Sequence, residues 1–164
     1  MALQSKLIVY AAIAGVLGLM GLIVWYSSLE HPELEKVEIE LVGIDVISVN
    51  KVENTAKLNV KFMVSNPGEK TFTVSLINYE LFADGEYVGN GQYSTADIPM
   101  PGRPIFSSGS SIPLENKFEL HKSEISNDVY DAILNDEITG FKVEGMITTE
   151  SAWSLIEKDF ESQI

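Results

Sequence analysis

The chain has 164 residues, no cysteine, 45% hydrophobic residues and a net charge of −13, from 11 basic and 24 acidic residues. This composition excludes a disulfide scaffold and overall disorder, and the length predicts one domain. It also argues against nucleic acid as a partner, because phosphate binding depends on clustered Lys and Arg. All 24 acids lie at or beyond Glu30 and the first 29 residues carry only Lys6, so the rest, with 10 basic residues, has a charge of −14.

Residues 7–26 form the strongest pattern in the sequence, twenty uncharged and mostly apolar residues. As a helix they would span a bilayer core of about 30 Å, which predicts one transmembrane helix after a tail of residues 1–6. A cleaved signal peptide would need a shorter apolar core and a small residue three positions before the cut, where Trp25 or Tyr26 would stand. We therefore interpret the segment as an uncleaved anchor.

The charges beside this helix predict its orientation. Lys6 precedes the helix and Glu33 lies in the acidic stretch that follows it. Because basic flanks stay inside, we expect a single-pass protein of the cell membrane with a cytoplasmic N-terminus. Residues 27–35 would be an acidic stalk and residues 36–164 an extracytoplasmic domain.

Small residues recur at helical spacing inside the predicted span. Such a face allows two helix backbones to approach closely, so it would suit a partner helix. Gly and Ala are also common in any membrane helix, and both interpretations stay open. The residues of this possible helix-packing face are Ala11, Ala14, Gly15 and Gly18.

The remaining chain shows strand patterns. Residues 57–65 alternate between apolar and polar side chains, which predicts a half-buried antiparallel strand. Residues 37–46 and 72–81 alternate too, but each changes phase once, the first near Gly43, which indicates a bulge. In the first of these segments, Val42, Ile44 and Val46 form the apolar face after the change of phase. Further strands are predicted within residues 86–94, 110–120 and 140–149.

Turns and one helix complete the predicted domain. Residues 66–68 and 84–85 carry turn residues between strands. Residues 121–137 show a helical apolar face, with Ser123 as the predicted N-cap and Gly140 just past the end. About six strands and one helix predict an all-β, antiparallel Greek-key β-sandwich of fibronectin or immunoglobulin type behind the transmembrane helix.

The segment SNPGEKTFTVSLINYELFADGEYVGNG resembles the core of the late embryogenesis abundant group 2 domain, also called the water stress and hypersensitive response (WHy) domain. The resemblance covers about residues 36–149. It implies a folded binding and protective module of the desiccation and water-stress response, without catalytic machinery. The resemblance also implies a structural role for the residues at the motif positions. These residues are Asn66, Pro67, Tyr79, Leu81, Gly85, Gly89 and Gly91.

Residues 94–111 depart from that family pattern, because the family has a shorter connection there. The stretch contains three prolines and Arg103, the one arginine of the chain. It would be either a solvated linker or a stiff recognition loop, which binds at low ordering cost.

No pattern in the sequence calls for catalysis or a cofactor. The chain has no G-x-S-x-G elbow, no phosphate-binding loop and no cluster of metal-binding residues. We interpret His31 and His121 as polar surface. A calcium site among the nearby acids is disfavoured, because the calcium loop is missing and the acids lie on a predicted helix. These acids are Asp128, Asp131, Asp136 and Glu137.

Two functions of different classes remain. The first is a non-enzymatic anchored module whose acidic surface keeps it soluble while it binds stressed client proteins at the outer face of the membrane. The alternative is an accessory or assembly subunit of a complex with other membrane proteins. Neither needs a cofactor or a small-molecule substrate, and an archaeal source is expected.

Overall fold

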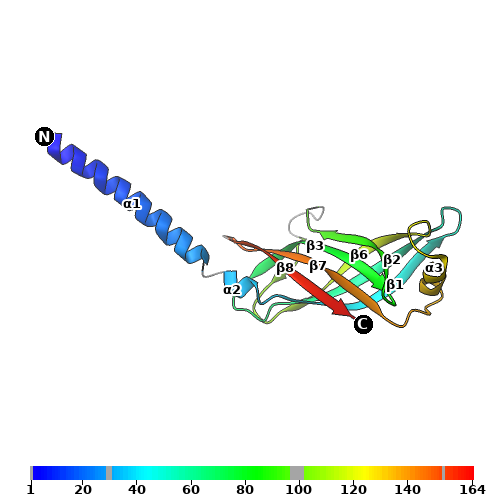
Figure 1. Ribbon diagram of the computed structural model, residues 1–164. Coiled ribbons are helices and arrows are strands. Elements are labelled where there is room, and N and C mark those ends of the chain that lie inside the picture. The colour runs from blue at the N-terminus through cyan, green and yellow to red at the C-terminus, as the bar shows by residue number, and fades with distance from the viewer. Residues whose placement is uncertain (1, 29–30, 97–101, 153) are drawn as a thin grey trace.

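The computed structural model describes residues 2–28, 31–96, 102–152 and 154–164. Helix α1, Ala2–Ser28, projects from one end of the folded domain, beside the short helix α2, His31–Leu34 (Figure 1). Its segment Lys6–Tyr26 has a mean hydropathy of 2.6 and none of it is buried. The prediction of an N-terminal apolar helix long enough to cross a bilayer is confirmed, although a signal sequence shares these properties.

Two antiparallel sheets form the domain. Sheet A has the strand order β1-β2-β6, and sheet B has the order β4-β3-β7-β8 with β5 beside β3. The chain changes sheet after β2, before β6 and before β7, which confirms the predicted Greek-key β-sandwich. The strands are β1 (Glu38–Asn50), β2 (Thr55–Ser65), β3 (Phe72–Ala83), β4 (Glu86–Ser94), β5 (Ile105–Phe106), β6 (Ser111–His121), β7 (Phe141–Glu150) and β8 (Leu155–Gln163).

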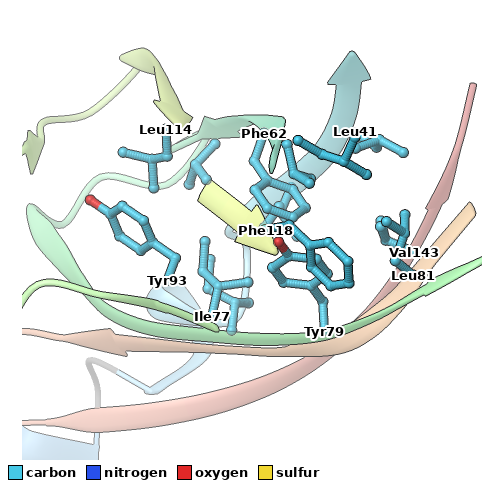
Figure 2. Packing of buried hydrophobic residues seen from close by; sticks show 14 of the residues in the cluster. Leu41, Phe62, Ile77, Tyr79, Leu81, Tyr93, Leu114, Phe118 and Val143 are labelled. Atoms are coloured by element: carbon cyan, nitrogen blue, oxygen red, sulfur yellow. The ribbon is translucent and has the colours of Figure 1, made fainter. Parts of the chain in front are cut away.

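The core lies between the two sheets, where the inward side chains of both meet (Figure 2). In β2 every second residue from Leu58 to Val64 is fully buried, as the alternation predicted. Phe62 of sheet A contacts Tyr79 of sheet B edge to face, with the ring centroids 5.0 Å apart. The pleat of each strand thus directs one apolar face into a common core.

Both predicted bulges exist. The β1–β2 register shifts between Leu41 and Gly43, and the β3–β7 register shifts between Val74 and Leu76. The expected burial beyond the first bulge is met only at Ile44, which packs against the core, and is wrong for Val42 and Val46, which are 46% and 39% exposed. Here β1 is an edge strand, and β8 lies beside its beginning rather than its end.

The soluble helix starts later than predicted. Helix α3 runs over Asn127–Leu134, and its N-cap is Ser126, whose hydroxyl accepts a hydrogen bond from the Val129 amide at 3.3 Å. The predicted cap, Ser123, lies in the turn before it. Since Ser126 also bonds Glu86 on β4, tertiary contact selects the later start.

Strand β8 was not predicted, because charged residues interrupt its apolar pattern. Ile156 and Phe160 face the core side, but Lys158 stands between them. Its ammonium donates to the carbonyl oxygens of Glu35 at 2.9 Å and Val37 at 2.6 Å. This lysine joins β8 to the segment that leads into β1.

The segment predicted as a stalk is partly built into the domain. Leu34 is fully buried, and the Glu33 carboxylate accepts hydrogen bonds from the Glu69 amide at 2.9 Å and the Lys36 ammonium at 2.6 Å. These bonds, and the Glu69 amide first, hold the pKa of Glu33 below its usual range. The folded unit therefore begins a few residues before residue 36.

The β3–β4 hairpin has the predicted two-residue turn. Asp84 and Gly85 have φ values of 48° and 86°, as a type I′ turn requires. The Asp84 carboxylate accepts hydrogen bonds from the Thr139 hydroxyl at 2.5 Å and from the Gly140 amide at 3.0 Å. The turn is thereby joined to the connection between α3 and β7.

Replacing Asp84 with Asn should remove an acid-dependent part of the stability. The bonds from Thr139, and then those from the backbone, lower the pKa of Asp84. Its stabilisation is therefore present above the unfolded-state pKa of about 3.9 and lost as pH falls through the lowered value. The free energy of unfolding in urea should be larger for the wild type than for D84N at neutral pH, and the two values should be equal below the lowered pKa. A difference that stays constant down that range would contradict this.

Candidate functional site

The motif residue Tyr79 lies at the centre of the sandwich. Its ring is 2% exposed, and its hydroxyl donates to the Asn116 side-chain oxygen at 2.7 Å. The Asn116 amide in turn donates to the Gln92 carbonyl oxygen at 2.7 Å, so a polar bridge joins β3, β6 and β4. Burial raises the pKa of Tyr79 far above its usual value, so the phenol stays protonated.

Glycines make room for this tyrosine ring. A Cβ added to Gly91 would lie 2.1 Å from the Tyr79 Cζ atom. Gly89 faces Phe118 in the same way, at 2.9 Å from its Cζ atom. On the other side of β3, a Cβ at Gly145 would lie 2.1 Å from the Asn78 carbonyl oxygen. The motif spacing therefore serves packing around Tyr79.

Asn66 closes the end of the sandwich nearest α1. It is 1% exposed, and its side-chain NH₂ donates to the carbonyl oxygens of Lys70 at 2.8 Å and Phe106 at 2.9 Å. Its side-chain oxygen accepts from the Gly68 amide at 3.0 Å. Pro67, by contrast, is exposed. The Asn66 side chain thus joins the β2–β3 connection to β5, and both its NH₂ and its oxygen are engaged within the protein.

The predicted helix-packing residues lie along α1, away from the sandwich. Ala11, Ala14, Gly15 and Gly18 are all exposed, and a Cβ at either glycine would have no atom within 4 Å. The face is sterically open.

The outer face of sheet B carries an acidic hollow. It has a volume of about 1090 Å³, and the cross-strand register aligns its side chains in two rows. The Lys142 ammonium forms ion pairs with Glu144 and Glu161, both at 2.6 Å. The other acids of the hollow, Glu80 and Asp159, are not paired with this lysine. The main lining residues are Asn78, Glu80, Asn90, Gln92, Glu144, Met146, Asp159 and Glu161.

The outer face of sheet A has a different charge balance. Lysines and acids alternate across its strands, and Lys61 lies 2.5 Å from Asp45. Its charged residues, on the rows of β2, are the three lysines Lys57, Lys61 and Lys117 and the five acids Glu38, Glu40, Asp45, Glu115 and Glu119. The excess negative charge therefore lies more on sheet B than on sheet A.

The four acids near α3 do not come together. Asp131 lies 3.1 Å from the Lys122 ammonium, and Asp136 stands in the turn after the helix. Within the described ranges, no group of three or more His, Cys, Asp or Glu side chains could hold a metal ion. His121 lies at the end of β6 opposite Thr55, while the side chain of His31 lies outside the described residues.

The connection at residues 94–111 is partly anchored. Its residues 105–106 form β5 against β3, and Phe106 is fully buried and stacks on Phe72 at 5.2 Å. Arg103 is half-buried. The stretch 97–101 lies outside the described residues, and the choice between a linker and a recognition loop for residues 94–111 stays a prediction.

Asn116, Gly145 and the acidic hollow were missed by the sequence analysis. Asn116 stands in the inward phase of β6 between Leu114 and Phe118, and its bonds to two other strands explain a polar residue at that position. The hollow had one available signal, the acids at every second position of residues 157–161, which place three carboxylates on one strand face.

Comparison with solved structures bears on the fold. The solution structure of At1g01470 from Arabidopsis thaliana matches at 18% identity with a TM-score of 0.51, over 77% of this chain and 80% of that one. A crystal structure of a protein from Archaeoglobus fulgidus matches at 19% identity and a TM-score of 0.48, over 77% and 96% of the two chains. The first comparison supports the sandwich fold alone. No family model matches the chain. Among curated proteins no relative is found.

Proposed function

We propose that the chain is a single-pass membrane protein with a cytoplasmic N-terminus and an extracytoplasmic sandwich domain. The exposed apolar helix and the charges beside it support this arrangement. A contact at the end of α1 supports it too, since the Lys70 ammonium lies 5.3 Å from the centre of the Tyr26 ring. An aromatic residue at this position suits the water–lipid interface.

We further propose that the domain is a WHy-type module that protects other proteins at the outer face of the membrane and is not an enzyme. The observation that carries this proposal is the charge of −14 on residues 30–164, of which the acidic hollow on the outer face of sheet B is one part. Like-charged complexes repel one another, so a client protein bound to such a domain would stay soluble. The motif residues support the assignment, because they maintain the sandwich.

The test is suppression of aggregation by the full chain in lipid nanodiscs. A soluble enzyme is heated to its aggregation temperature and light scattering is recorded. We expect the loaded nanodiscs to delay aggregation when the chain is present at or below the molar concentration of the enzyme. The comparison sample contains empty nanodiscs and an inert protein of similar net charge. Equal scattering in both samples would overturn the protective function.

The alternative proposal is an accessory or assembly subunit, and the open face of α1 at Gly15 and Gly18 favours it. A stoichiometric membrane partner should then extract with the chain in mild detergent. Loss of that partner in the variant G15L/G18L, with the partner retained in the control L17I/L22I, would identify the helix face as the contact.

A further inference from the structure

Exposed apolar side chains are concentrated at one place in the domain. Beyond residue 30, nine large apolar side chains of the described residues are exposed, and five of these lie between residues 42 and 52. We name these five the β1 shelf. They are Val42 (46% exposed), Val46 (39%), Ile47 (52%), Val49 (40%) and Val52 (92%).

Part of the shelf belongs to the inner face of sheet A but lacks a cover. Val46 pairs with the fully buried Leu58, and Val49 pairs with the buried Ala56, so both occupy core-facing positions. Strand β8 covers β1 only near its start, where the Leu41 amide donates to the Ser162 hydroxyl at 2.9 Å. The second half of β1 therefore extends past the opposing sheet.

Hydrogen bonds organise the β1–β2 turn at the end of the shelf. The Asn50 side-chain oxygen accepts from the amides of Val52 at 3.1 Å and Glu53 at 3.3 Å, and its NH₂ donates to the Glu53 carboxylate at 2.6 Å. Val52 therefore stands exposed in a hydrogen-bonded turn. A preformed surface binds a partner at a lower ordering cost than a flexible loop does.

The same strand offers backbone hydrogen bonds. In sheet A, β1 pairs with β2 on one side and with no strand on the other, within the described part of the chain. The bulges at Val42 and Ile47 interrupt this edge, and such bulges protect edges against long pairing. Short pairing remains available at residues 43–46 and 48–50, beside the exposed apolar side chains.

We propose that the β1 shelf binds an extended apolar segment of a partly unfolded protein by adding it as a short strand to the edge of sheet A. This inference rests on the protective function proposed above and names its contact surface. Strand addition supplies main-chain hydrogen bonds, and apolar side chains of the segment would cover those of the shelf. Flanking Lys or Arg in the segment would suit the charge of −14 on residues 30–164.

A second copy of the chain fits the shelf less well. Residues 30–164 of each copy carry −14, so two copies repel each other. The strand also leads away from the α1 end of the sandwich, with its turn at the opposite end (Figure 1). Copies inserted in one bilayer would point the same way, so their β1 strands could not pair in antiparallel fashion. That position also keeps the shelf away from the bilayer.

The probe for the test is a fluorescent ten-residue peptide, four Val-Thr repeats between two terminal lysines. Its anisotropy is measured against the full chain in nanodiscs. The variant V46K/V49K changes the shelf, and the control I105K/L155K adds the same charge at side chains exposed elsewhere, by 61% and 57%. Circular dichroism melting verifies that both variants fold.

We expect V46K/V49K to bind the peptide at least about tenfold more weakly than wild type, because the variant loses two apolar contacts that the bound peptide would bury. The control should bind like wild type, and a peptide with Pro in place of each Thr should lose affinity, since it lacks those N–H donors. Equal binding by the two variants, or no binding by wild type, would overturn the inference. So would a dimer in detergent that V46K/V49K dissociates, which would favour a second copy.

The aggregation assay separates this inference from the proposed function. Protection by wild type that V46K/V49K loses and I105K/L155K keeps supports both. Protection that V46K/V49K keeps in full overturns the shelf as the client site and leaves the protective function standing. No protection by wild type overturns the protective function itself.

Discussion

Gly91→Ala should destabilise the domain by about 2–3 kcal/mol, and removing the Tyr79 ring should relieve most of that loss. The added Cβ would lie 2.1 Å from the Tyr79 Cζ atom, so the ring or the strand must move. Overpacking of this kind costs about 1–3 kcal/mol. In Y79L the ring is absent, so adding G91A should cost much less than it does in wild type. Urea unfolding of the full chain in detergent, followed by the β signal in circular dichroism, measures this double-mutant cycle.

Gly145→Ala provides the matched comparison. Its Cβ would lie 2.1 Å from the Asn78 carbonyl oxygen and 2.8 Å from the Tyr79 Cα atom, both of the backbone. Tyr79→Leu should therefore not relieve G145A. Gly43→Ala serves as control, because the nearest atom there is the flexible Lys61 Cδ at 3.9 Å. Additive losses for G91A and Y79L would contradict the packing role of the motif glycines.

The architecture could be predicted because most strands alternate strictly. Leu58 and Phe62 point into the core, and Lys57 and Lys61 point outward, so period two identifies β2 without any other element. The bulge at Gly43 was equally local, since a bulge changes the phase within one strand. Strand β8 escaped prediction because Lys158, on its inner side, bonds carbonyl groups of a segment more than a hundred residues away.

The surfaces were harder to predict than the strands. Val46 has the phase of a core residue, but its burial depends on how far the opposite sheet extends. The acidic hollow combines carboxylates of three strands, including β8, which had not been predicted. The motif residues could be selected from the family resemblance, yet their partners could not. Tyr79 bonds Asn116 from another sheet, and spacing along the chain contains no information on that pair.

Asn66 should be the most sensitive position at the α1 end of the sandwich. Replacing it with Ala leaves the carbonyl oxygens of Lys70 and Phe106 without this donor and the Gly68 amide without its acceptor. An unsatisfied buried group costs about 1–3 kcal/mol, so we expect a loss of about 3 kcal/mol in the free energy of unfolding. The control is Ser111→Ala, which removes a 2.7 Å hydrogen bond to Ser65 at an exposed position nearby. Similar losses in both variants would contradict the role assigned to Asn66.

Asn66→Asp tests the direction of these bonds. The introduced carboxylate can still accept from the Gly68 amide, but it places an oxygen against two carbonyl oxygens where the NH₂ now donates. At neutral pH N66D should be less stable than N66A, because burial and repulsion disfavour the charged form. The folded-state pKa of that carboxyl is then raised above its unfolded-state value of about 3.9. Its protonated form therefore stabilises the folded domain below a pH of about 3.9, and this stabilisation is lost as the pH rises through the folded-state pKa. Urea unfolding of N66D and N66A over that range should therefore show the gap closing toward acid pH. A gap independent of pH would mean that the two carbonyl groups turn away from the carboxylate.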